Sequence, residues 1–144
     1  MPLRFAMGWY RVGPAALQTR ERRIHMTLSV NVYTRNDNGA MQIVEPAESG
    51  HELAGFESYR HGLYGSEAAR SLGFVLLPTL AVSDIYAEGE QVTQLQREAE
   101  IALANIARFE LEARTTVEHL RSRFQNIIRA CKHAASIGGG VVIW

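Results

Sequence analysis

The sequence predicts an α+β domain in which a small, mainly antiparallel sheet packs against a long antiparallel helical hairpin. Three observations support this prediction. Apolar and polar residues alternate at 28–34, as in a strand. Apolar residues then recur at steps of three and four over 90–110 and 116–136, as in amphipathic helices. The sequence closes with a β-branched apolar run at 141–144. We expect residues 26–144 to form one domain, because this length is typical of a single hydrophobic core.

The first two strands are expected to form a β-hairpin. Leu28, Val30 and Val32 alternate with polar side chains, which places these aliphatic residues on one face of a sheet. Residues 35–39 are turn formers, and the shorter run 40–44 follows them.

A long connection and a short helix come next. Residues 45–65 contain several glycines and few aliphatic residues, so we expect a connection without regular structure. Ser66 is suited to cap a short helix over 67–72, and Gly73 is suited to end it.

Two further apolar runs complete the predicted sheet. The run 74–77 ends at Pro78 and is assigned to a strand, although a packed helical turn has the same pattern. The run 141–144 is expected to be buried as a strand that pairs with 28–34.

The two long helices are expected to meet at a turn near 113–115, where Thr115 and Glu118 have the spacing of a capping box. Their charges are opposite. Residues 88–112 hold six Glu and two Arg, whereas 113–136 hold five basic residues and one Glu. This pattern indicates two complementary helices. The alternative, a nucleic-acid surface on the basic second helix, is disfavoured because the acidic helix would repel phosphate.

Composition excludes several classes of protein. Cys131 is the single cysteine, so the chain forms no intramolecular disulfide, and a reducing, cytoplasmic location is expected. No apolar run approaches the roughly 20 residues that span a bilayer, so no membrane partner is expected. Residues 1–25 hold five Arg and one Glu. We interpret them as a basic leader outside the core, with a nucleic-acid-binding arm and a targeting peptide as alternatives.

No cofactor and no metal site are expected. The glycines at 138–140 follow a predicted helix, whereas a phosphate-binding loop precedes one. His51, Glu52, Glu57 and His61 supply metal-ligand side chains, but they lie in a loop and lack the helical spacing of a zinc motif. Cys131 lies in the apolar stripe of the second helix, which indicates a buried thiol rather than a nucleophile.

The stretch 55–67 carries the candidate site. Glu57, Tyr59, Arg60, His61 and Tyr64 are predicted to bind a partner protein, because tyrosine and arginine are enriched at the centres of interfaces. Two alternatives stay open. His61 could act as a general base oriented by Glu57, with Arg60 holding an anionic substrate, or the tyrosines could pack on the sheet in a structural loop.

The predicted function is therefore a non-catalytic protein-binding domain, such as an inhibitor, an immunity protein or an adaptor, whose partner is another protein. Self-association through the helical hairpin is a further possibility. The alternatives are a small metal-independent hydrolase or transferase that uses residues 57–64, and a nucleic-acid-binding protein that uses the basic second helix.

Overall fold

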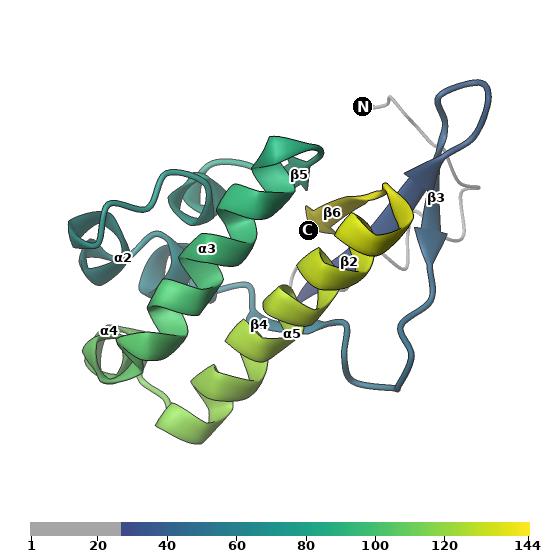
Figure 1. Cartoon of the computed structure of the whole chain (residues 1–144). Coiled ribbons are helices and arrows are strands. Elements are labelled where there is room, and N and C mark those ends of the chain that lie inside the picture. The colour runs from purple at the N-terminus through teal and green to yellow at the C-terminus, as the bar shows by residue number, and fades with distance from the viewer. Residues whose placement is uncertain (1–26) are drawn as a thin grey trace.

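The computed structural model describes residues 27–144 of the chain, and the predicted basic segment 1–25 lies outside them. The described residues form a sheet with helices on one of its faces (Figure 1). The strands are β2 (Thr27–Arg35), β3 (Met41–Val44), β4 (Leu53–Phe56), β5 (Ile85–Ala87) and β6 (Gly140–Ile143). The helices and helical turns are η1 (Arg60–Tyr64), α2 (Glu67–Ser71), η2 (Leu77–Ala81), α3 (Glu90–Ala104), η3 (Ile106–Phe109), α4 (Glu110–Ala113) and α5 (Val117–Ile137). The predicted α+β class is confirmed.

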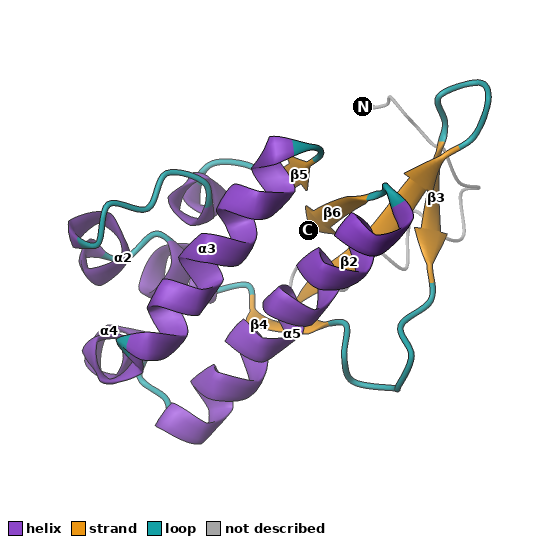
Figure 2. Ribbon diagram, in the orientation of Figure 1, coloured by secondary structure: helices purple, strands orange, loops and turns teal. Residues whose placement is uncertain are grey.

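The sheet is built around β2, and its strand pairs are antiparallel. The order is β3-β2-β6-β5, with β4 also paired to β2 (Figure 2). Val30 lies opposite Ile143 and Val32 lies opposite Val141, so the C-terminal strand pairs with the first strand as predicted. The predicted hairpin is also confirmed, because β2 pairs with β3 across the turn at 36–40.

Two short strands, β3 and β4, pair with the side of β2 that faces away from β6. β3 pairs with the C-terminal half of β2 and β4 pairs with its N-terminal end. Since β6 occupies the opposite edge, β3 and β4 follow one another along the same edge of β2. Residues 45–51 leave this edge between them, and the chain returns at Glu52, whose carbonyl accepts the amide of Val30. The segment 45–65 therefore contains a strand and a helical turn, where the sequence predicted only a connection.

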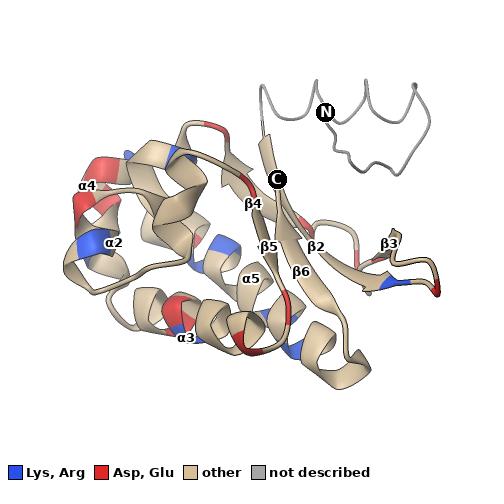
Figure 3. Ribbon diagram, turned by 90° about the horizontal axis from the view of Figure 1, so that it is seen from above, with Lys and Arg blue, Asp and Glu red and all other residues tan. Residues whose placement is uncertain are grey.

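The helical layer consists mainly of α3 and α5, which run antiparallel against one another (Figure 1). Viewed from above, both lie on one side of the sheet, and α5 contacts β2, β4 and β6 (Figure 3). The predicted apolar stripe of α5 is buried: Leu120, Phe124, Ile127, Cys131 and Ala134. The two helices were predicted to complement each other in charge, but no ion pair links α3 to α5 within residues 27–144.

Two helix ends differ from the prediction. The first long helix was expected to reach residue 110, but α3 ends at Ala104, where the Asn105 side chain donates to the Ile101 carbonyl and the chain tightens into η3. The cap of α5 is Thr116 rather than Thr115, because the Thr116 hydroxyl accepts a hydrogen bond from the amide of His119. At both positions an Asn or Thr side chain hydrogen-bonds to a nearby backbone group, which is common at helix ends.

The predicted strand at 74–77 is wrong. Leu77 begins the 3-10 helix η2, with Pro78 in its first turn. The amides of Val75, Leu76 and Leu77 donate to the buried carboxylate of Glu98 on α3, so they are unavailable to a sheet ladder. The sheet instead gains β5, a three-residue strand that the sequence analysis missed and that pairs with β6.

Candidate functional site

The five residues predicted to bind a partner lie between β4 and α2, and the structure does not present them on one surface. Tyr59 and Tyr64 are buried, with 3% and 1% of their surface exposed. Glu57 and Arg60 are half-buried, and His61 is exposed. Each of these side chains therefore has to be considered by its own contacts.

Arg60 holds this segment against the end of η2. Its Nε donates to Glu57 Oε1 at 2.6 Å and its Nη2 donates to Asp84 Oδ1 at 2.6 Å. Nη1 donates to the carbonyls of Leu80 and Ser83. With these donors occupied, Arg60 is placed to stabilise the fold rather than to hold an anionic substrate.

Tyr64 has a structural role. Its hydroxyl donates to the carbonyl of Ala54 on β4 at 2.6 Å, and its ring meets Phe124 of α5 edge-on. Burial raises the pKa of Tyr64 well above its usual range, with the neighbouring Tyr59 adding to the effect. The alternative of a tyrosine packed beside the sheet therefore describes Tyr64 well.

Tyr59 belongs to a group of rings between β4 and α5. Phe56 and His119 are stacked nearly parallel, with ring centroids 5.6 Å apart and an interplanar angle of 7°. Tyr59 meets both rings edge-on, at 5.5 and 5.9 Å. Gly55, at φ 112°, makes this packing possible, because a Cβ at that position would lie 2.2 Å from the Tyr59 ring. We call Phe56, Tyr59, His119 and Arg123 the Tyr59 cluster.

Three polar atoms of this cluster have no hydrogen-bond partner among the described residues. Tyr59 Oη, His119 Nε2 and Arg123 Nε are buried and unpaired, and so is Oε2 of Glu57, two residues before Tyr59. They make up four of the five such side-chain atoms among residues 27–144. Buried polar groups are normally paired, and each unpaired group costs about 1–3 kcal/mol. These atoms are therefore free to pair with water or with a polar group of a ligand.

Electrostatics fix the charge state of the cluster. His119 and Arg123 lie one turn apart on α5. Burial, and then the charge of Arg123, lower the pKa of His119 below its usual 6.5, so the imidazole is neutral at neutral pH. A neutral imidazole offers one donor and one acceptor, and the tyrosine hydroxyl offers both. Beside them lies the guanidinium group of Arg123, whose Nη1 donates to Ser122 Oγ.

A surface hollow of about 530 Å³ opens beside the rings of Phe56 and Tyr59. Its opposite wall is formed by residues 112–115, which are the end of α4 and the start of the turn that leads to α5. Glu112 in this wall is engaged, since its carboxylate accepts the amides of Glu67 and Ala68 at the start of α2. Phe56 is 49% exposed at the rim of the hollow. The arrangement is thus an exposed aromatic ring at the edge of a hollow, with polar groups packed behind it.

In the predicted enzymatic alternative Glu57 orients His61, and the structure does not pair these two side chains. Glu57 contacts Arg60, whereas His61 is exposed. Cys131 is fully buried, and burial raises the pKa of its thiol to about 12, which disfavours the reactive thiolate. Within residues 27–144, no group of His, Cys, Asp or Glu side chains is placed to hold a metal ion.

Three members of the Tyr59 cluster, Phe56, His119 and Arg123, were not predicted as site residues. The sequence places His119 on the flank of the apolar stripe and Arg123 on the basic helix, and neither position points to a site. Their one-turn spacing was a usable signal. However, the spacing indicates a site only when it is known that Phe56 stacks on His119, and Phe56 is held there by the unpredicted strand β4.

Comparison with known proteins adds no assignment. No family model matches the sequence, and no match was found among curated proteins or solved structures. The part of the chain that the structure describes contains no helix with the length and apolar character needed to cross a membrane.

Proposed function

We propose that this chain is a non-catalytic protein-binding domain, of the kind that acts as an inhibitor, an immunity protein or an adaptor. Its contact surface is the hollow beside the Tyr59 cluster. The observation that supports this proposal is the half-exposed Phe56 ring, which is held in place by stacking on His119. A large apolar ring fixed at the rim of a hollow is ready to bury its exposed face without a loss of side-chain freedom.

The surroundings of Phe56 match the composition of interface centres. Aromatic residues and arginine are enriched there, and they act in pockets that exclude water. Leu111 is highly exposed on α4, next to the residues that form the far wall of the hollow. Arg114 in that wall is exposed as well. A partner seated over the hollow would cover apolar and cationic side chains together.

Net charge indicates the kind of partner. Residues 26–144 carry fourteen acidic and ten basic side chains. α4 carries Glu110 and Glu112, and the acidic part of its ribbon is red in Figure 3; Glu112 also lines the hollow. An acidic surface accelerates association with a basic protein through electrostatic steering. We therefore propose a basic partner protein and predict that the association rate constant falls as salt is raised.

The test compares two truncations of exposed apolar side chains on the full chain. Phe56→Ala removes the proposed anchor. Ile137→Ala, at the opposite end of the α5 region, removes a side chain of similar exposure, 44% against 49%. Tagged forms of the wild type and both variants are purified under mild conditions from the organism that makes the protein, and stoichiometric partners are identified by mass spectrometry.

The proposal predicts one protein that is retained by the wild type and by Ile137→Ala and lost by Phe56→Ala. With the purified partner, Phe56→Ala should weaken binding about 30-fold or more, as expected for an interface hot spot. A protein retained equally by all three forms would contradict the proposed surface. The absence of a stoichiometric protein partner would contradict the proposed function.

A further inference from the structure

A second cavity, of about 260 Å³, lies at the opposite half of α5 from the Tyr59 cluster. It exists because β3 and β4, which lie along the same side of β2, are separated by a loop. β3 ends at Val44 and β4 begins at Leu53, and residues 45–51 form a loop that leaves β2 (Figure 1). The space left between this loop, β2 and α5 is not filled by side chains.

The walls of this cavity are largely apolar. Val30 and Val32 line it from β2, Val44 from β3, Pro46 from the loop and Ala130 from α5. Its volume lies just below the range of about 300–1,000 Å³ usual for ligand sites. A ligand that displaces water from these walls needs a small apolar body.

Asn126 makes the cavity rigid. Its Nδ2 donates to the carbonyls of Gly50 at 3.1 Å and Leu53 at 2.8 Å, which fixes both ends of the second half of the loop against α5. Its Oδ1 accepts a hydrogen bond from Arg129 Nη1 at 2.6 Å. The Asn126 amide is thereby used inside the chain, while it orients the guanidinium of Arg129.

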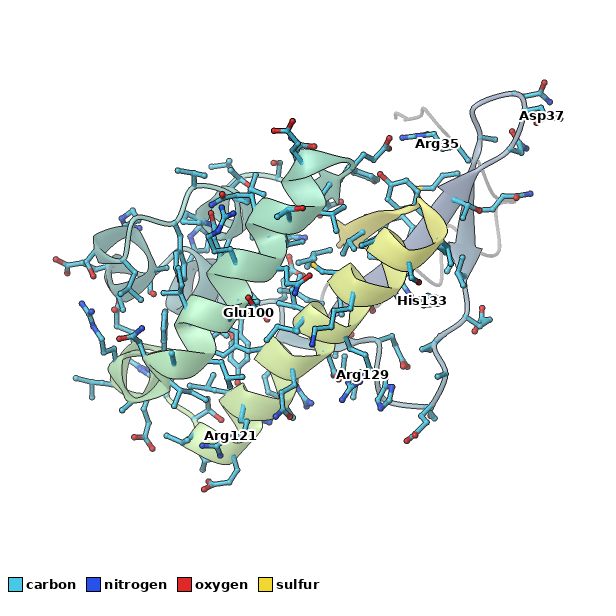
Figure 4. The ribbon with its side chains drawn as sticks, in the orientation of Figure 1. Arg35, Asp37, Glu100, Arg121, Arg129 and His133 are labelled. Atoms are coloured by element: carbon cyan, nitrogen blue, oxygen red, sulfur yellow. The ribbon has the colours of Figure 1, made fainter. Side chains whose placement is uncertain are left out.

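The polar part of the lining favours a negative charge. Arg129 and His133 line the cavity from α5 and His51 lines it from the loop, whereas the lining contains no Asp or Glu. Figure 4 shows Arg129 and His133 on the side of α5 that faces the loop. The carboxylate of Glu48, also in the loop, lies 3.7 Å from Nε2 of His51, and its side chain is largely exposed to water. Within residues 27–144, Arg129 makes no ion pair, so its charge is available to a ligand.

We propose that this cavity binds a small monocarboxylate, with its short branched apolar chain between β2 and α5 and its carboxylate paired with Arg129. A planar carboxylate matches the fork of a guanidinium group. Inorganic phosphate fits less well. It has no apolar part to cover Val30 and Val32, and it needs more hydrogen-bond donors than the polar side chains of this cavity supply. The ligand site is separate from the proposed protein-binding surface, so either proposal can fail without the other.

The test is a titration of the full chain with isovalerate, followed through the backbone amide resonances of Val44, Ala47 and Ala130. Isobutyrate and benzoate are titrated as further acids, isovaleramide as the neutral counterpart, and inorganic phosphate as the non-apolar anion. For a ligand of about seven non-hydrogen atoms, we expect a dissociation constant of about 1 mM. Isovaleramide and phosphate should each bind at least about ten-fold more weakly.

Three variants locate the binding. Arg129→Gln removes the charge of an exposed side chain and should weaken isovalerate binding at least about ten-fold. Arg121→Gln removes the same charge nearer the start of α5, outside the cavity lining, and should leave the affinity unchanged (Figure 4). Ala47→Leu, in the exposed loop, fills the cavity and should abolish the shifts. The proposal is overturned if none of the three acids binds saturably, if isovaleramide binds as well as isovalerate, or if Arg129→Gln binds like the wild type.

Discussion

Glu98 is the buried acid on which the η2 region depends, and replacing it with alanine should destabilise the fold. The Glu98 carboxylate accepts hydrogen bonds from the amides of Val75 at 2.8 Å, Leu76 at 3.1 Å and Leu77 at 2.9 Å. Gln94 Nε2 donates to it as well, at 2.9 Å. These contacts join α3 to the chain just before η2.

The loss in the free energy of unfolding caused by Glu98→Ala depends on which of the three amides can hydrogen-bond to water once the carboxylate is gone. Val75 is 62% exposed, so its amide can be solvated, whereas Leu77 is buried and its amide cannot. A hydrogen bond to a charged group is worth about 1.5–3 kcal/mol, and an orphaned buried donor costs about 1–3 kcal/mol. Removal of the buried charge returns part of this cost. We expect a net loss of about 3 kcal/mol, or about 12 °C in Tm for a domain of this size.

Urea unfolding and thermal denaturation of purified protein measure this loss. The matched control is Glu100→Ala on the same helix, because Glu100 is exposed and accepts only the Gln96 side chain. That control should change the free energy of unfolding by no more than about 0.5 kcal/mol. Equal stability of Glu98→Ala and Glu100→Ala would refute the reasoning, since it would mean that the three amides do not depend on the carboxylate.

Three further predictions concern the site and the core. Because burial and then a neighbouring arginine lower the pKa of His119 below 6.5 in the folded chain, this residue leaves stability unchanged above about pH 6.5 and reduces it as the pH falls from there toward the folded pKa. Urea unfolding between pH 7 and pH 5 should show this decline in wild type and in the control His133→Gln, and a smaller decline in His119→Gln; identical slopes would argue against it. Cys131 should react with an exposed-thiol reagent only as fast as the protein unfolds, because it is buried with a pKa of about 12, and rapid native labelling would contradict its burial. Gly55→Ala should cost about 1–3 kcal/mol more than Gly39→Ala, since both glycines have positive φ but only the Cβ at 55 would strike an aromatic ring. Equal losses of stability in the two glycine variants would show that the ring moves freely.

The parts of the fold with a strong local pattern were predictable. The alternation around Val30 predicts β2, and the three-and-four spacing predicts α5 to within one residue at each end. The β-branched C-terminal run predicts β6 and its pairing with β2. In each case a single element carries enough apolar residues to show which face is buried.

The short strands β4 and β5 were not predictable, because other parts of the chain determine them. β4 has four residues, one of them Gly55 at positive φ, and β5 has three. Neither run carries enough apolar residues to show which face is buried, and each forms a strand because a neighbouring strand edge accepts it. The apolar run at 74–77 looks like a strand in sequence. It does not form one, because its backbone amides donate hydrogen bonds to the carboxylate of Glu98, more than twenty residues later.

The candidate site follows the same division. Sequence identified the segment that holds Glu57 and Tyr59, but not the contacts that pair Arg60 internally and bury Tyr64. His119 completes the site from α5, and its role depends on the missed strand β4, which ends with Phe56.

The most direct test of the proposed contact surface is site-specific photo-crosslinking in the cells that make the protein. A photoreactive amino acid replaces Ser58, which is exposed in the wall of the hollow, or Asp37, which is exposed in the β2–β3 turn far from it (Figure 4). The account predicts that the probe at 58 crosslinks to one basic protein and that the probe at 37 does not. Crosslinking to the same protein from 37 alone, or no protein adduct from 58, would contradict the central claim.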